Sequence, residues 1–248
     1  MRGVALGICP DVTLADITHE IAPQDVLGGA LELAAAYKYF PRGTVFLCVV
    51  DPGVGSARRA LAAEAAGYRF VAPDNGLLTV VFKETAPEQV VELTDPRYAR
   101  ATISRTFEGR DRFAPAAAWL ATGVEVRALG TRVTTWRMLD VPEPCATGGQ
   151  LSGVVLRIDR FGNLITNIDR RSFDAFAAGH ATEIEVAGHR VAKLVDTYAA
   201  AESGSACALF GSSEHLEVAY PRDSAADRLG VTRGAEVVVR LKHVSAPC

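Results

Sequence analysis

Cysteine is scarce in this sequence, and its spacing argues against two kinds of covalent or metal stabilisation. There are five cysteines, widely scattered and without a Cys-x-x-Cys pair: Cys9, Cys48, Cys145, Cys207 and Cys248. A disulfide framework uses an even set of cysteines, and a structural zinc site uses clustered Cys and His ligands. We therefore expect free thiols, no metal site and a cytoplasmic protein.

Long apolar runs and an excess of one charge are also missing. No segment approaches the ~18 apolar residues that cross a bilayer, and residues 1–12 lack the pattern of a secretion signal. The 26 basic and 29 acidic residues leave a formal net charge of -3. A chain with this balance has no basic surface for nucleic acid or anionic lipid, so we expect neither partner and instead a small-molecule substrate.

Several enzyme signatures are absent as well. The chain has no GxxxxGK[ST] loop, no GxGxxG that opens a helix after a strand, and no GxSxG. Its histidines show no spacing typical of metal ligands. These absences disfavour a P-loop enzyme, a dinucleotide-binding enzyme, a serine hydrolase and a metal hydrolase.

What is present in residues 1–143 is an alternation of strand-like and helix-like segments. The segment TVFLCVV (44–50) is apolar throughout, which predicts a strand buried on both faces. An Ala/Leu-rich stretch at 26–40 predicts a helix. We also expect strands at 12–18, 60–66, 68–73 and 89–94 and helices at 76–84 and 110–123. This order predicts a three-layer α/β/α domain with a mainly parallel sheet.

The pattern changes at DVPEPCATGGQ (140–150), a Pro/Gly-rich linker. Residues 144–248 then form short strand-like segments at close spacing, with almost no helical periodicity. We predict a second domain in this region, a small antiparallel β-barrel.

Asp51 is the first candidate for chemistry. It directly follows the apolar segment 44–50 and opens the sequence DPGVGSARR. Loops at the carboxyl ends of strands form the ligand crevice of an α/β sheet, so a site at Asp51 is plausible. The alternative is structural, because Asp-Pro-Gly is common turn chemistry and Asp51 could simply bond its own backbone.

Three further polar clusters allow the same two interpretations. In TFEGRDRFAP (106–115), Glu108 and Asp111 could be functional, or they could be an N-terminal helix charge and a helix cap. APDNGLLT (72–79) places Asp74 and Asn75 at a strand end. IDRFGNLITNI (158–168) places Asp159, Phe161 and Asn163 at the tip of a hairpin, where such residues usually serve backbone geometry.

Taken together and in order, five motifs resemble one family. They are DITHEIAPQDV, VVDPGVGSARR, APDNGLLT, TFEGRDRFAPAAA and DRFGNLITNI. The chain resembles the adenosine-forming S-adenosyl-L-methionine hydrolases, which are related to the fluorinases and chlorinases. The resemblance implies a homotrimer that holds S-adenosylmethionine between the large domain of one subunit and the small domain of its neighbour. It implies attack of water on the ribose 5′ carbon, with no separate cofactor because S-adenosylmethionine is the substrate.

The resemblance also assigns roles to residues. Asp51 would accept a hydrogen bond from the attacking water, Arg58 would hold that carboxylate in its charged form, and Glu108 would stand where many relatives have histidine. Two carboxylates beside one arginine would titrate as a coupled set. The implied substrate-binding residues are Asp74, Asn75, Asp159, Phe161, Asn163, Tyr198 and Ser213, with the ring of Tyr198 stacked on adenine.

The sequence departs from the family pattern in two further ways, and two alternative functions stay open. The halogenases have arginine where this chain has Glu214, and relatives begin with a strand ending in Asp-Phe-Gly, whereas this sequence starts inside the following helix. We therefore expect the first strand of the large domain to be missing from residues 1–143. The rivals are a halide-using S-adenosylmethionine halogenase and a catalytically silent binder of S-adenosylmethionine or adenosine.

Overall fold

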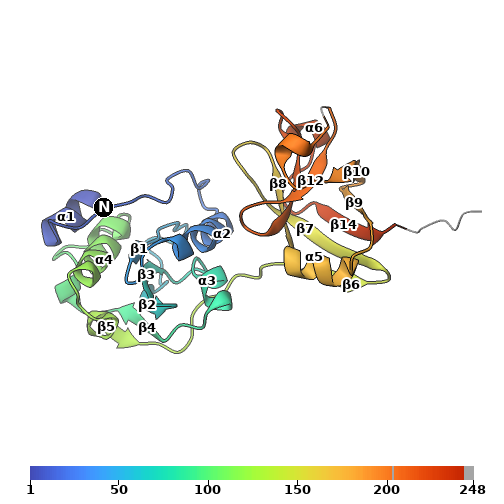
Figure 1. Cartoon of the computed structure of the whole chain (residues 1–248). Coiled ribbons are helices and arrows are strands. Elements are labelled where there is room, and N and C mark those ends of the chain that lie inside the picture. The colour runs from blue at the N-terminus through green and yellow to red at the C-terminus, as the bar shows by residue number, and fades with distance from the viewer. Residues whose placement is uncertain (203, 243–248) are drawn as a thin grey trace, which may run out of the picture. The chain divides into compact units, whose positions relative to one another are not determined.

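The structure is a computed structural model that describes residues 1–202 and 204–242; Cys248 lies outside these ranges. The chain forms two compact units, Met1–Asp140 and Val141–Cys248 (Figure 1). The division falls inside the Pro/Gly-rich segment 140–150. Across the described residues, no helix is both long and apolar enough to cross a bilayer.

The first unit is built on a five-stranded sheet with the order β1-β3-β2-β4-β5. The strands are β1 (Val45–Leu47), β2 (Ala60–Ala65), β3 (Tyr68–Pro73), β4 (Gln89–Leu93) and β5 (Gly130–Arg132). Strands β1 and β3 pair in parallel, and each of the other pairs is antiparallel. The α/β class is confirmed, but the sheet is mixed rather than mainly parallel, because β2 and β3 form a hairpin instead of being joined through a helix.

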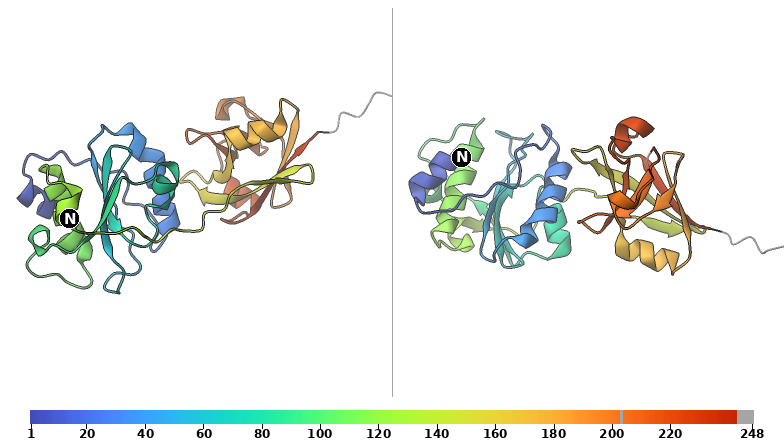
Figure 2. Two further views of the ribbon diagram at one scale, coloured as in Figure 1. Left: turned by 90° about the horizontal axis from the view of Figure 1, so that it is seen from below. Right: turned by 45° about the horizontal axis from the view of Figure 1, so that its top comes forward.

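Helices cover both faces of this sheet, which gives three layers (Figure 2). The helices are α1 (Arg2–Ile8), α2 (Val26–Ala36), α3 (Thr79–Glu84) and α4 (Ala114–Ala121). Shorter helical turns lie at Tyr37–Tyr39, Pro96–Tyr98, Gly109–Phe113 and Val126–Leu129. Leu61 and Ala63 of β2 face the core under α2 and α3, whereas Ala60 and Ala62 face the core under α4. This alternation is the period-two pattern of a strand that is buried on both faces.

The segment 12–18 is not a strand, and this prediction was wrong. Its alternating residues suit a strand, but a strand also needs a neighbour that accepts its backbone hydrogen bonds. No sheet pairing involves 12–18, and Leu14 is exposed. The helix expected at 26–40 is confirmed as α2 followed by the turn Tyr37–Tyr39.

The second unit is a nearly closed, barrel-like sheet. Its strands are β6 (Cys145–Thr147), β7 (Gln150–Ile158), β8 (Leu164–Asp169), β9 (Thr182–Val186), β10 (His189–Val191), β11 (Lys193–Leu194), β12 (Cys207–Phe210), β13 (His215–Ala219) and β14 (Glu236–Leu241). They follow the order β10-β9-β14-β7-β8-β13-β12-β11, with β6 on β7. Among the described residues of this unit all strand pairs except β11 and β12 are antiparallel, so the expected antiparallel barrel is confirmed.

Two helices of this unit were not expected from the sequence: α5 (Arg170–Ala177) and α6 (Ala225–Leu229). Helix α5 is capped at its N-terminus by Asp169, whose side chain accepts a hydrogen bond from the backbone N–H of Ser172. Phe173 and Ala177 bury one narrow face of it against the barrel core. A helix of about two turns buries too few residues to leave a clear periodicity in the sequence.

Candidate active site

The loop 51–58 leaves the sheet at the carboxyl end of β1 and carries two candidate residues. Its first turn is closed by a hydrogen bond of 3.3 Å from the N–H of Val54 to the carbonyl of Asp51. Gly55 has φ +78°, and a Cβ there would lie 2.6 Å from the carbonyl oxygen of Arg105. Glycine therefore allows the loop to turn and to pack closely against the segment that leads to Glu108.

Arg58 joins Asp51 to Glu108. Its Nε donates to Oδ1 of Asp51 at 2.8 Å, and its Nη2 donates both to Oδ2 of Asp51 and to Oε2 of Glu108. All three side chains are nearly buried: Arg58 is 9% exposed, Asp51 6% and Glu108 13%. The structure thus brings together the three residues expected to act on the water, although Arg58 and Glu108 are fifty residues apart in the chain.

The surroundings of Arg58 keep its guanidinium charged. Burial alone would lower the pKa of Arg58, but the hydrogen bonds and negative charges of Asp51 and Glu108 outweigh it, and the pKa is raised. The guanidinium also lies over the ring of Phe113, with Cζ 5.2 Å from the ring centroid. This contact adds cation–π attraction on the apolar side of the cluster. One fixed cation therefore faces two carboxylates in a partly desolvated position.

Glu108 directly precedes the π-helical turn Gly109–Phe113, which runs on into α4. One turn further, Nη2 of Arg112 lies 3.9 Å from Oε1 of Glu108. This second cation is more exposed and more distant than Arg58, so it neutralises Glu108 less strongly. The turn fixes Glu108 at the end of a buried helix rather than on a mobile loop.

Asp111 is not a helix cap, although capping was one interpretation of its position. Its buried carboxylate accepts hydrogen bonds from Arg110 at 2.7 and 2.8 Å and from the N–H of Ser104 at 2.9 Å. These bonds hold the pKa of Asp111 well below its usual range, the Arg110 side chain contributing most. Asp111 therefore fastens the segment before Glu108 to the start of α4.

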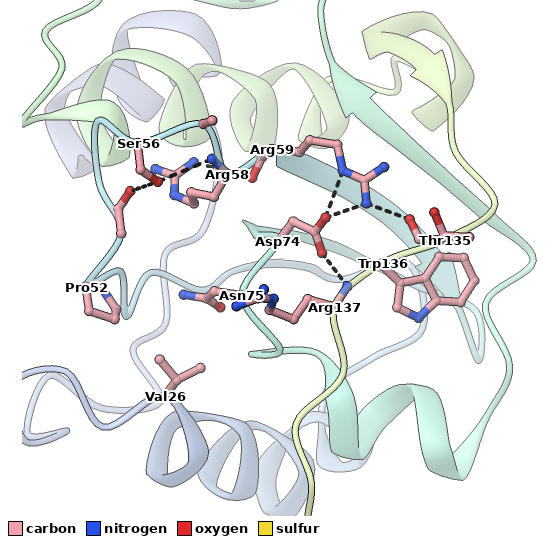
Figure 3. A pocket seen from close by; sticks show the side chains of 12 residues that line it. Val26, Pro52, Ser56, Arg58, Arg59, Asp74, Asn75, Thr135, Trp136 and Arg137 are labelled. Atoms are coloured by element: carbon pink, nitrogen blue, oxygen red, sulfur yellow. Dashed lines mark hydrogen bonds and ion pairs between the residues drawn. The ribbon is translucent and has the colours of Figure 1, made fainter.

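A cleft of about 900 Å³ lies beside the cluster in the first unit (Figure 3). Its walls are formed by residues of the 51–58 loop, of the turn after β3 and of the segment after β5. The lining residues are Val26, Pro52, Gly53, Ser56, Ala57, Arg58, Arg59, Asp74, Asn75, Thr135, Trp136 and Arg137. Arg58 belongs both to the cluster and to the wall of the cleft, so it links the two.

Asp74 and Asn75 line this cleft, but their polar atoms bind other parts of the same unit. Asp74 accepts hydrogen bonds from the side chain of Arg59 and from the backbone N–H of Arg137, as Figure 3 shows. The Nδ2 of Asn75 donates to the carbonyl of Val50 at 2.8 Å. Their expected contact with substrate stays a prediction.

In the second unit, Asp159, Phe161 and Asn163 lie at the tip of the β7–β8 hairpin, as expected. Oδ1 of Asp159 accepts hydrogen bonds from the backbone N–H groups of Phe161 at 2.8 Å and Asn163 at 2.9 Å, and Oδ2 accepts from Nδ2 of Asn163 at 3.0 Å. Phe161 projects with 70% of its surface exposed, whereas Asn163 is 7% exposed. The acid therefore shapes the tip and leaves an aromatic ring accessible.

Tyr198 is held by a buried acid, Glu217. Its hydroxyl donates to Oε2 of Glu217 at 2.8 Å, although 48% of Tyr198 is exposed. Burial of the hydroxyl end, the hydrogen bond to Glu217 and the nearby charges of Glu217 and Asp159 raise the pKa of Tyr198 well above its usual range. The phenol is thus anchored at one end while its ring stays available at the surface.

Ser213 lies in the turn between β12 and β13, and its Oγ is buried. Within the described residues no group forms a hydrogen bond with this oxygen. Its neighbour Glu214 adopts φ +56° and forms an ion pair with Arg170, whose guanidinium stacks on the ring of Phe210. Glu214 therefore points its charge toward Arg170.

Glu217 was not recognised in the sequence. Its signal is an acid inside the apolar strand segment HLEVAY (215–220), at a position whose neighbours are buried. Gly211 packs so closely against it that a Cβ at Gly211 would lie 1.8 Å from Oε1 of Glu217. No three His, Cys, Asp or Glu side chains in residues 1–202 and 204–242 form a group suited to a metal ion.

Fold and site together define a two-domain protein: an α/β unit with a carboxylate–guanidinium–carboxylate cluster at a strand end, followed by a β-barrel unit. Comparison with known proteins gives a match in both units. Residues 1–130 match the SAM hydroxide adenosyltransferase N-terminal domain, and residues 153–238 match the C-terminal domain of the same family. The chain belongs to the SAM hydroxide adenosyltransferase family.

Relatives agree with this assignment over nearly the whole chain. The (R)-S-adenosyl-L-methionine hydrolase of Thermus thermophilus is 39% identical over 244 residues, which cover 96% of this chain and 91% of the relative. A fluorinase of Nocardia brasiliensis is 30% identical over 273 residues, covering 97% and 91%. The crystal structure of an uncharacterized conserved protein from Thermotoga maritima superposes with a TM-score of 0.91 at 32% identity, covering 96% and 93%.

Proposed function

We propose that this protein is an enzyme that hydrolyses S-adenosyl-L-methionine to adenosine and L-methionine. The observation that carries the proposal is the buried cluster of Asp51, Arg58 and Glu108 at the carboxyl end of β1. The name of the 39% identical relative supports the choice of substrate and reaction.

In the proposed step, the oxygen of a water molecule forms a bond to the ribose 5′ carbon. The bond between that carbon and the sulfonium sulfur breaks, and its electron pair goes to sulfur, which leaves as the neutral thioether of methionine. Water loses one proton to the Asp51 carboxylate, which later releases it to solvent. Sulfur needs no proton in order to leave, so the enzyme must align the water and accept its proton.

Each residue of the cluster has a separate task in this step. Arg58 fixes both oxygens of Asp51 through two hydrogen bonds, which leaves the remaining lone pairs of the carboxylate to accept from water. Glu108 shares the same guanidinium and adds a second negative charge. This charge attracts the cationic sulfonium of the substrate. It also favours transfer of the water proton to the cluster. We assign the base to Asp51 because Arg58 orients it on two sides.

Residues of the second unit are proposed to hold the rest of the substrate. The accessible ring of Tyr198 offers a flat face for adenine, with Phe161 and Asn163 beside the base. Asp159 is proposed to bind the amino group of the methionine part. The buried Oγ of Ser213 has the free hydrogen-bonding capacity that a carboxylate would use.

The stereochemistry of the substrate can also be proposed. The name of the Thermus relative, (R)-S-adenosyl-L-methionine hydrolase, specifies an (R) centre in addition to the L-configured carbon. A sulfonium with three different substituents is stereogenic, and we assign (R) to this sulfur. We assign the same epimer to this protein, and separated sulfonium epimers would test the choice by their relative rates of adenosine release.

The proposed assembly is a homotrimer in which the barrel unit of a neighbouring subunit completes each site. Light scattering after gel filtration would test it, since the expected particle mass is three times that of one chain. The proposed location is the cytoplasm, supported by scattered thiols without a disulfide pattern. Cell fractionation would test the location.

The decisive experiment is incubation of the protein with S-adenosylmethionine in water labelled with heavy oxygen. We expect adenosine that carries the label at its 5′ oxygen, together with methionine. The absence of adenosine, with binding retained, would instead identify a silent binder.

Added chloride or fluoride tests the halogenase alternative in the same assay. A halide about 4 Å from the Asp51 carboxylate would meet repulsion of ~4 kcal/mol at an effective dielectric near 20. We therefore expect no 5′-halo-5′-deoxyadenosine. Its halide-dependent formation would overturn the assignment of water as nucleophile.

A further inference from the structure

The topology of the first unit places two residues directly under the 51–58 loop. This loop joins β1 to β2, but β3 lies between those strands in the sheet. Strand β1 runs parallel to β3, and Ala60 at the start of β2 pairs with Pro73 at the end of β3. The loop must therefore cross the carboxyl end of β3, where the chain continues into Asp74 and Asn75.

Asn75 binds the first end of the loop. Its Nδ2 donates to the carbonyl of Val50 at 2.8 Å, and Val50 is the residue immediately before Asp51. Its Oδ1 accepts from the N–H of Leu77 at 3.2 Å, which fixes the amide in this orientation. Asn75 thus ties the backbone that carries the acid to the turn after β3.

Asp74 binds the other end of the loop. Its Oδ2 accepts from Nε of Arg59 at 2.8 Å and from Nη2 at 2.6 Å, and its backbone N–H donates to the carbonyl of Arg59 at 3.0 Å. Arg59 is the residue immediately after Arg58. The Asp74 side chain is only 8% exposed, and its Oδ1 accepts from the N–H of Arg137 at 2.7 Å.

We propose that Asp74 and Asn75 are positioning residues that clamp both ends of the 51–58 loop, so that Asp51 and Arg58 keep their relative placement. The loop itself contains Gly53 and Gly55, whose backbones are freely mobile in an unrestrained chain. Holding Val50 and Arg59 at fixed points of the sheet restricts the conformations left to the loop. This role differs from the substrate contact expected from the sequence, and its catalytic consequence depends on the proposed hydrolase function.

The first test is Asn75→Ala, with Asn167→Ala as a matched control. Asn167 in the second unit makes the same two kinds of hydrogen bond. Its Nδ2 donates to the carbonyl of Pro142 at 3.0 Å, and its Oδ1 accepts from the N–H of Val154 at 2.7 Å. We expect Asn75→Ala to speed amide hydrogen exchange in segment 49–59 and to lower kcat by roughly 10- to 100-fold, with KM changed less than about threefold, as misplacement of a reacting group predicts. Asn167→Ala should leave exchange at 49–59 and kcat unchanged.

The second test is Asp74→Asn, which keeps the size of the side chain but removes its charge. The control is Asp95→Asn, because Asp95 forms a similar ion pair with Arg97 away from the loop. Faster exchange at 49–59 with a lower kcat is expected for Asp74→Asn alone. If Asn75→Ala does not fold, Asp74→Asn alone tests whether the 51–58 loop is clamped.

The clamp is refuted if exchange at 49–59 is unchanged in a folded Asp74 or Asn75 variant, or if exchange rises while kcat stays at the wild-type value. A rise in KM alone would also refute it, because it would indicate substrate contact instead. If the wild-type protein releases no adenosine, the proposed function fails, but the clamp can still be tested. Unchanged exchange at 49–59 in the Asp74 and Asn75 variants would exclude the clamp, and faster exchange would support it.

Discussion

Nε of Arg58 lies 2.8 Å from Oδ1 of Asp51, and the same guanidinium donates to Glu108 through Nη2. One cation is thus shared by two carboxylates that are each less than one-seventh exposed. The cluster carries an excess of negative charge, and Arg112, 3.9 Å from Glu108, offsets only part of it. A water held against such a group meets a strong hydrogen-bond acceptor, and a sulfonium meets an attractive field.

Asp51→Asn and Glu108→Gln separate the roles of the two acids. Both amides keep an oxygen that accepts from Arg58, so both variants should fold. Loss of a general base typically costs about 10²- to 10⁴-fold in rate, and we expect a loss of that size in kcat for Asp51→Asn. Glu108→Gln should lose less than about tenfold, because its charge acts on the substrate without accepting the proton. Adenosine release followed by chromatography measures both, and a larger loss in Glu108→Gln would transfer the base role to Glu108.

Arg58→Met should destabilise the fold. Removing one partner of a buried ion pair leaves uncompensated charge and typically costs about 3–5 kcal/mol. We expect a loss of this order in the free energy of unfolding measured with urea. Adding Asp51→Asn and Glu108→Gln to Arg58→Met should recover part of the loss, because the uncompensated charges are then gone. No recovery in the triple variant would show that Arg58 stabilises through packing on Phe113 rather than through charge.

Tyr198→Ala should weaken substrate binding far more than Tyr198→Phe. Stacking of a base on an aromatic ring contributes about 1–3 kcal/mol, so the alanine variant should raise KM by roughly 5- to 150-fold. The phenylalanine variant keeps the ring and loses only the bond to Glu217. Equal KM values for the two variants would mean that the ring does not contact adenine.

Glu217→Gln should lower the pKa of Tyr198, since it removes a neighbouring negative charge while keeping an acceptor for the hydroxyl. Burial and Glu217 raise the folded-state pKa of Tyr198 above the unfolded value of about 10. Its contribution to stability is therefore fully present below about pH 10 and is lost as pH rises through the folded pKa.

The measurement is tyrosinate absorbance against pH, with Tyr198→Phe subtracted to isolate this phenol. Wild-type protein should lose stability above about pH 10 more steeply than Glu217→Gln, because its Tyr198 resists ionisation more strongly. An unchanged Tyr198 titration in Glu217→Gln would contradict the contact seen between the two side chains.

Sequence patterns predicted much of the site because the relevant residues follow strand ends. The apolar run before Asp51 identified β1, and the loop after a strand of an α/β sheet is where ligands bind. The contact between Arg58 and Glu108 was reached only through the family resemblance, since nothing in the spacing of two segments fifty residues apart shows that they meet.

Other features were outside what local pattern can predict. The alternating segment 12–18 has the composition of a strand but lacks a partner, and hydrogen-bond pairing depends on what lies beside a segment. Glu217 was not singled out from the sequence, because its burial depends on contacts with Gly211 and Tyr198. The roles of Asp74 and Asn75 also depended on strand order, because only the position of β3 between β1 and β2 places them beneath the loop.

By itself, then, the sequence determined the α/β and barrel classes of the two units, the strand-end location of Asp51 and the hairpin tip at Asp159, since these depend on hydrophobic period and turn chemistry along the chain. Only the tertiary structure decided the mixed sheet, the hydrogen-bond geometry by which Arg58 holds two acids and the anchoring of Tyr198 by Glu217. These depend on contacts between distant segments, whose geometry is set by packing and backbone hydrogen bonding of the whole unit.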